Sequence, residues 1–119
     1  MTELDRCRPW IEAALEYSGG THEWQDIVDG VVSGHMQLWP GQTFAFVTEI
    51  TRYPRRRVCN MFLGGGDLGA ILAMHGHVEQ WAKAQGCDAL TISGRLGWKL
   101  HLKRHGWEPL HLTMMKELI

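Results

Sequence analysis

Residues 56–93 combine four patterns in order: a strand, a glycine run, an apolar stripe with helical spacing, and a short strand (56–63, 64–66, 67–86 and 88–93). A helix that links two strands of one sheet nearly always leaves those strands parallel. We therefore predict a βαβ crossover in which the glycines break the first strand and Asp67 begins the helix. The two strands should lie side by side and diverge at Gly64.

The remaining segments are typical of helices before this unit and of strands on either side of it. We expect helices over Pro9–Tyr17 and from Thr21 to Gly34, and strands at 36–40, 42–52 and 111–116. The turn at Tyr53 predicts that strands 42–52 and 56–63 pair as an antiparallel hairpin. Residues 96–103 alternate like a strand, yet the basic cluster before Gly106 resembles the end of a helix.

Together these patterns predict a single α/β domain, with a helical part (1–35) followed by a mixed sheet and crossover (36–119). A hydrophobic fraction of 45% argues against disorder, and a net charge of −1 makes nucleic acid an improbable partner. No apolar run is long enough to cross a membrane, so we expect a soluble, cytoplasmic protein. The three separated cysteines predict neither disulfides nor a zinc site, and Cys59 and Cys87 are expected to pack as small apolar side chains.

Two local motifs carry a resemblance to the GNAT (Gcn5-related N-acetyltransferase) fold, which covers about two thirds of the chain from Phe44 onward. They are MFLGGGDLGA (61–70) and HGW (105–107), which looks like the family's Gly-Phe step after its last helix. Three further segments (THEWQDIVDGV, AFVTEI with YPRRRV, and GDLGAILAM) are similar to small GNAT-like proteins of tailed phages and prophages. The resemblance implies that residues 96–103 form a helix.

In that family the glycine loop binds the pyrophosphate of acetyl-CoA or another acyl-CoA, and the pantetheine arm lies where two parallel strands part. The resemblance implies a cofactor site made of Phe62, Leu63, Gly64, Gly65, Gly66, Asp67, Leu68 and Gly69. Two positions depart from the family pattern. Gly64 stands where the family has a basic or amide side chain, and Asp67 stands at the first glycine position. Asp67 is a good helix N-cap, and its carboxylate would oppose a phosphate there.

Acyl transfer to an amine needs a base and an acid. Glu49 lies in the middle of a predicted strand and is our candidate base. The family's usual tyrosine acid is replaced by Leu102, so the flanking His101 and His105 are the candidate acids. The i, i+4 spacing of these histidines also suits a metal, but no third ligand is placed to complete a site, so none is predicted.

Two function classes remain open at this point. One is an acyl-CoA-dependent N-acyltransferase with an altered cofactor loop. The other is a catalytically silent module that binds proteins, such as a head or tail component of a phage virion. Arginines at the hairpin turn suit a protein partner better than DNA, and a homo-oligomer is the alternative (Arg52, Arg55, Arg56 and Arg57). Trp98 and Trp107 are expected at an interface or at the mouth of a cleft.

Overall fold

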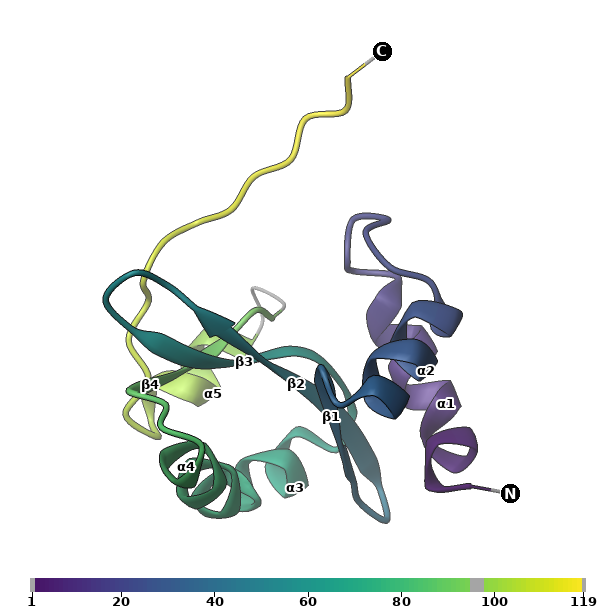
Figure 1. Cartoon of the computed structure of the whole chain (residues 1–119), viewed down its shortest axis with the longest axis horizontal. Helices are drawn as coiled ribbons and strands as arrows, with labels where there is room; N and C mark the ends of the chain where they lie inside the picture. The colour runs from purple at the N-terminus through teal and green to yellow at the C-terminus, as the bar shows by residue number, and fades with distance from the viewer. Residues whose placement is uncertain (1, 95–97, 119) are drawn as a thin grey trace.

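Two helical pairs cover opposite faces of one four-stranded sheet (Figure 1). The computed structural model describes residues 2–94 and 98–118. Its elements in chain order are α1 (Glu3–Leu15), α2 (Trp24–Ser33), β1 (Met36–Pro40), β2 (Phe44–Arg52), β3 (Arg57–Gly66), α3 (Leu68–Ala73), α4 (His75–Ala84), β4 (Ala89–Ile92) and α5 (Lys99–Lys103). The strand order is β1-β2-β3-β4. The first three strands are antiparallel and β4 is parallel to β3, as the crossover predicts.

The alternation of side chains along β2 divides the interior into two cores. Phe44 and Phe46 pack with α3 and α4, whereas Ala45 and Val47 pack with α1 and α2. All four are buried, so β2 is apolar on both faces in its first half. This central strand fixes which helices face which side of the sheet.

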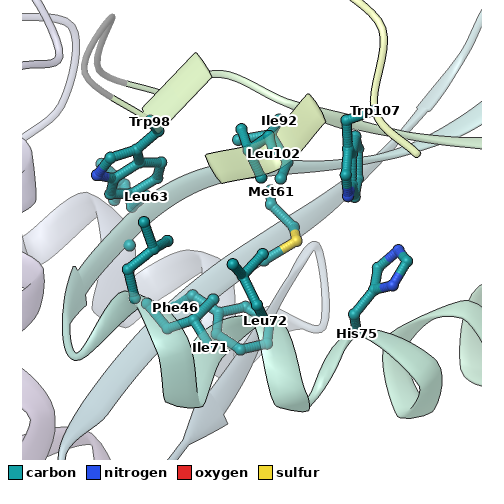
Figure 2. A pocket seen from close by; sticks show the side chains of 12 residues that line it. Phe46, Met61, Leu63, Ile71, Leu72, His75, Ile92, Trp98, Leu102 and Trp107 are labelled. Atoms are coloured by element: carbon teal, nitrogen blue, oxygen red, sulfur yellow. The ribbon is translucent and has the colours of Figure 1, made fainter. Parts of the chain in front are cut away.

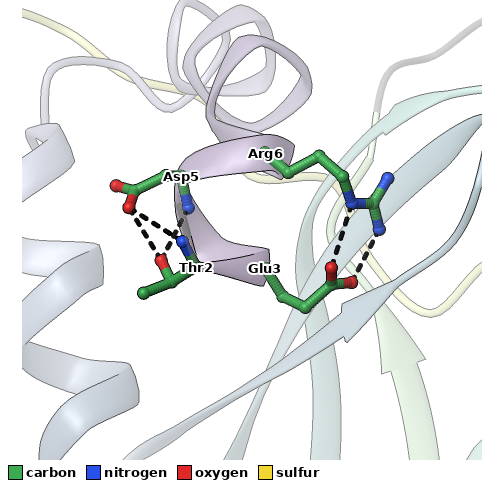
Figure 3. A network of polar contacts seen from close by, with 4 residues as sticks. All are labelled: Thr2, Glu3, Asp5 and Arg6. Atoms are coloured by element: carbon green, nitrogen blue, oxygen red, sulfur yellow. Dashed lines mark hydrogen bonds and ion pairs between the residues drawn. The ribbon is translucent and has the colours of Figure 1, made fainter.

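The first helix begins earlier than predicted, because a capping box precedes Pro9. The Thr2 hydroxyl accepts from the Asp5 backbone N–H (3.2 Å), and the Asp5 carboxylate accepts from the Thr2 N–H (3.2 Å) (Figure 3). These hydrogen bonds hold the pKa of Asp5 below its usual range. Pro9 therefore lies inside α1, where it removes one backbone hydrogen bond. The prediction that Pro9 is the first helical residue was wrong.

The second helix also begins later than predicted. Glu23 is its N-cap and Asp26 accepts from the Glu23 N–H (2.9 Å), while the Thr21 hydroxyl donates to the Ser18 carbonyl. Its predicted end is confirmed, since Gly34 adopts the left-handed conformation with φ of 86°.

The glycine run does not break β3, contrary to the prediction. The strand continues through Gly66, and Gly64, Gly65 and Gly66 pair with β2. Close backbone approach explains two of the glycines: a Cβ at Gly65 would overlap the Trp10 carbonyl oxygen of α1, and one at Gly66 would overlap the Thr43 carbonyl oxygen. These glycines permit tight packing between chain segments.

The predicted crossover helix is two helices that meet at Met74. The Met74 N–H donates to the Ile71 carbonyl (3.0 Å), three residues back, so the turn tightens there. After α4, Gly86 reverses the chain with φ of 80°, and β4 follows. The predicted end of the helical region at Gly86 is confirmed.

The described residues of segment 96–103 form α5, as the family resemblance implied and the alternation did not; Leu96 lies outside the described residues. Gly106 ends this helical turn with φ of 87°, and the Trp107 N–H donates to the Leu102 carbonyl (3.2 Å). The predicted strand at 111–116 is not formed. Residues 108–118 are exposed and belong to no helix or strand, because no neighbouring strand lies beside them in the sheet.

The three cysteines are free thiols. Cys59 is fully buried, which confirms its prediction, and Cys87 is half-buried at the edge of the same core. Burial raises the pKa of the Cys59 thiol from 9.0 to about 11. Separately, no helix among the described residues is both long and apolar enough to cross a bilayer.

A raised thiol pKa in the folded state makes stability depend on alkaline pH. Because the unfolded thiol ionises first, its contribution is fully present below pH 9 and is lost as the pH rises towards 11. The free energy of unfolding should therefore fall more steeply over this range in the wild type than in Cys59→Ala. Urea unfolding of both proteins at several pH values measures the difference, and identical slopes would contradict the assignment.

Candidate functional site

The parallel strands β3 and β4 part at Phe62. Their last cross-strand hydrogen bond runs from the Ser93 N–H to the Met61 carbonyl (3.0 Å). On the other side of β3, Val47 faces Leu63 and Thr48 faces Met61, so Phe62 is an extra residue that forms a β-bulge. Divergence was predicted at Gly64, and it begins two residues earlier. A bulge increases local twist, which helps to open the sheet at this point.

Aromatic side chains from the C-terminal part of the chain fill much of this gap on the α3–α4 face (Figure 2). Trp98 lies beside Leu63, and Trp107 lies above His75. The open space that remains is about 20 Å³, which is room for a single water molecule. The cavity is lined by Phe46, Met61, Leu63, Gly64, Leu68, Ile71, Leu72, His75, Ile92, Trp98, Leu102 and Trp107. The site is therefore apolar and nearly closed.

Three of the predicted cofactor residues line this cavity: Leu63, Gly64 and Leu68. A Cβ at Gly64 would lie 3.3 Å from the Trp98 ring, so the missing side chain leaves space that the indole uses. Phe62 turns to the α1–α2 core and packs against the His22 ring, 5.5 Å between centroids. The structure thus divides the predicted loop between two faces of the sheet.

The start of α3 is capped by a carboxylate. Asp67 Oδ1 accepts from the backbone N–H groups of Gly69 (2.9 Å) and Ala70 (3.4 Å). The predicted role of Asp67 as an N-cap is confirmed. These amides are the donors that an anion at this helix start would use, so the chain's own carboxylate now holds the anion position. Gly65 and Gly66 pack against backbone instead of facing this position.

Glu49 lies on the opposite face of the sheet from the cavity. It is half-buried in β2 and pairs across the strands with Met36 on one side and Asn60 on the other. Met36 belongs to the α1–α2 core, which places Glu49 on that face. Asn60 Oδ1 in turn accepts from the hydroxyls of Thr91 (3.0 Å) and Ser93 (3.2 Å) on β4. A polar row therefore crosses the sheet just before β3 and β4 part.

His101 and His105 are exposed, and neither lines the cavity, whereas Leu102 between them does. The structure does not bring them together with Glu49, whose role stays a prediction with theirs. Among the described residues, no group of three potential metal ligands is found.

His75 is a cavity residue that sequence reasoning assigned to the core. Its Nε2 lies 3.1 Å from a carboxylate oxygen of Glu79, and its ring lies 5.3 Å from that of Trp107. The Trp107 Nε1 is buried without a hydrogen-bond partner in the described part of the chain, and Figure 2 shows it pointing toward His75. A buried N–H donor at the wall of an apolar cavity is a feature that a ligand with an acceptor atom could satisfy. The unusual number of tryptophans was the available signal.

The arginine cluster separates into two parts. Arg52, Arg55 and Arg56 are exposed at the β2–β3 hairpin. Arg57 instead ties β3 to the approach to β4: its N–H donates to the Asp88 carboxylate (2.9 Å) and its guanidinium to the Gln85 carbonyl (2.7 Å). Arg57 therefore stabilises the crossover connection, and only the other three are available to a partner.

Comparison of the whole fold shows the same arrangement in solved structures of acetyltransferases. A candidate acetyl transferase from Pyrococcus furiosus matches with a TM-score of 0.70 at 13% identity, over 97% of this chain and 93% of that one. The chain has the GNAT fold. The BH1408 protein from Bacillus halodurans, as a tetramutant, matches with a TM-score of 0.67 at 14% identity, over 98% and 92% of the two chains.

An aminoglycoside acetyltransferase from an uncultured soil metagenomic sample, in complex with sisomicin, matches this GNAT-fold chain with a TM-score of 0.65. The identity is 8%, and the match covers 100% of this chain and 93% of that one. No protein-family profile and no curated protein matches the sequence. Likeness at this identity extends to the fold, so function has to be argued from the site.

An acyl-CoA fits this site in one part and not in another. The apolar walls between β3, α3 and α5 suit a pantetheine arm, but about 20 Å³ is far less than the several hundred Å³ of a ligand pocket. The start of α3 does not suit a diphosphate, because Asp67 occupies its amides and adds a negative charge. Trp98 and Asp67 are the two residues that oppose the cofactor.

Proposed function

We propose that this chain is a GNAT-type N-acyltransferase that uses an acyl-CoA and whose cofactor site is altered at α3. The observation that carries the proposal is the parting of β3 and β4 beside an apolar cavity, within a fold otherwise seen in acetyltransferases. A bound acyl-CoA would supply an activated thioester carbonyl for attack by an amine. The altered start of α3 makes weak cofactor affinity part of the proposal.

In this proposal Glu49 takes a proton from the amine, directly or through water, and His101 or His105 returns one to the leaving thiolate. The position of Glu49 beside Asn60 supports its role, since the sheet opens next to this row and is accessible there from both faces. The apolar side chains exclude water around the thioester. Movement of Trp98 would be needed to enlarge the cavity.

The charge of Asp67 gives the proposal its sharpest test. A carboxylate a few ångströms from a diphosphate costs about 1 kcal/mol or more, which corresponds to about fivefold in affinity. We expect Asp67→Gly to bind acetyl-CoA at least fivefold more tightly than the wild type in calorimetry. The variant should also lose about 1 kcal/mol of stability with the helix cap.

Asp67→Asn is the matched control, because asparagine also caps helices but carries no charge. Improved binding by both variants assigns the effect to charge. Improvement in Asp67→Gly alone assigns it to the release of the Gly69 and Ala70 amides. Tight binding by the wild type would contradict the opposing role of Asp67 and leave the acyltransferase proposal intact.

The second candidate is a catalytically silent GNAT-fold module that binds proteins, for example a component of a phage particle. The filled cavity and the occupied amides favour it, because both positions are satisfied by the chain's own residues. Binding of acetyl-CoA by neither the wild type nor the two Asp67 variants would select this candidate.

A further inference from the structure

The C-terminal segment, residues 108–118, has the pattern of a strand but no strand partner. Leu110, Leu112 and Met114 alternate with polar residues, and all three side chains are exposed. In Figure 1 this yellow segment leaves the body of the molecule in an extended course and ends far from the sheet. An apolar, period-two segment in water is one that a half-buried strand environment would stabilise.

The sheet offers a matching free edge at β4. This strand pairs with β3 on one side and is the last in the order β1-β2-β3-β4, so its other side has no partner among the described residues. The Asp88 N–H donates to β3, so by alternation the N–H groups of Ala89 and Thr91 point to the free side. All four residues of β4 are only half-buried. A short apolar edge of this kind is a template for an added strand.

The geometry around Trp107 directs the segment away from its own β4 edge. Gly106, with φ of 87°, reverses the chain, and Trp107 is held by its bond to Leu102 and by the cavity. Pro109 then fixes its own φ and keeps Glu108 extended, so an immediate reversal is disfavoured. Fully extended, residues 108–118 span about 36 Å. That reach is comparable to the 41 × 35 × 30 Å extents of the whole chain, so the segment reaches a neighbouring molecule easily.

We propose that the protein is a strand-exchanged dimer, in which residues 108–118 of each copy lie along the β4 edge of the other. The exchange is reciprocal and closes on itself, so it gives a dimer and not a filament. It buries the exposed apolar residues of both segments and pairs both free edges with backbone hydrogen bonds. The inference depends on the segment and the edge, and it holds whether or not the protein binds an acyl-CoA.

Light scattering after size-exclusion chromatography tests the dimer with the full chain. We expect a dimeric wild type and a monomeric Leu112→Asp, because a charge in the middle of the segment opposes strand burial. Leu112 is 67% exposed in the single chain, so the same substitution should leave the circular dichroism spectrum of the monomer unchanged. Val32→Asp is the matched control, since Val32 is an 80% exposed apolar residue on α2.

A monomeric wild type at high micromolar concentration overturns the proposal. So does a dimer that persists in Leu112→Asp, or one that Val32→Asp disrupts equally. A truncated chain that ends at Trp107 provides a second check: it should be monomeric and retain the native spectrum, and a dimeric truncated chain counts against exchange.

Disulfide trapping distinguishes exchange from return of the segment to its own chain. In a Cys87→Ser background, one protein carries Thr91→Cys and a second carries Leu110→Cys, Leu112→Cys or Met114→Cys. Because Cys7 and Cys59 are buried, a disulfide formed on mixing joins the two engineered sites. We expect a cross-linked heterodimer for at least one of the three pairs. A doubly substituted chain that closes only within itself, without heterodimers on mixing, overturns the proposal in favour of intramolecular pairing.

Discussion

Gly65→Ala is expected to lower the free energy of unfolding by about 3 kcal/mol, the upper part of the range for an overpacked core. The added methyl group would overlap the carbonyl oxygen of Trp10, a backbone atom in the middle of α1. A flexible side chain could turn aside, but here a helix has to move away from the sheet. Urea unfolding followed by tryptophan fluorescence measures the loss.

Gly76→Ala is the control for this substitution. Gly76 lies in α4, is exposed, and has nothing within 4 Å of the added carbon. Alanine is the better helix former, so a gain of about 0.5 kcal/mol is expected. A similar loss in both variants would mean that backbone flexibility, and not the contact with Trp10, explains Gly65.

The crossover was predictable because its signals are local and agree with one another. A β-rich segment, an apolar stripe with helical spacing and a second strand leave one arrangement, and Asp67 is a residue type that caps helices. The start of α1 was missed because the proline at position 9 was given more weight than the capping box of Thr2 and Asp5. The box satisfies backbone donors at the helix start, which offsets the hydrogen bond lost at Pro9.

The contents of the cavity could not be predicted from the sequence, because they depend on contacts between distant segments. Trp98 was expected at a cleft mouth, but its distance from Gly64 follows from how α5 packs on β3. The glycine run had a similar ambiguity, since glycine serves equally to approach a phosphate or a neighbouring backbone. The strand predicted at 111–116 failed for a related reason: a period of two describes a strand's faces and does not name its partner.

Glu49→Gln is expected to lower turnover at least about 100-fold while leaving acyl-CoA affinity nearly unchanged, the usual effect of losing a general base. The amide keeps the shape and polarity of the side chain in β2 but cannot accept the proton of an attacking ammonium group. Release of free CoA thiol from acetyl-CoA, measured with a panel of primary amines, gives the turnover. Calorimetry gives the affinity.

Glu79→Gln is the matched control, because it removes a half-buried carboxylate on the cavity face of the sheet. Glu79 contacts the Nε2 of His75, which lines the cavity, whereas Glu49 lies on the α1–α2 face with Asn60. If Glu49 is the base, turnover falls in its variant and is nearly unaffected in Glu79→Gln. The reverse result would transfer proton removal to His75, oriented by Glu79, and would place the amine on the same face as the tryptophans. Since the two carboxylates lie on opposite faces, the pair of variants identifies the side from which the acceptor approaches the gap between β3 and β4.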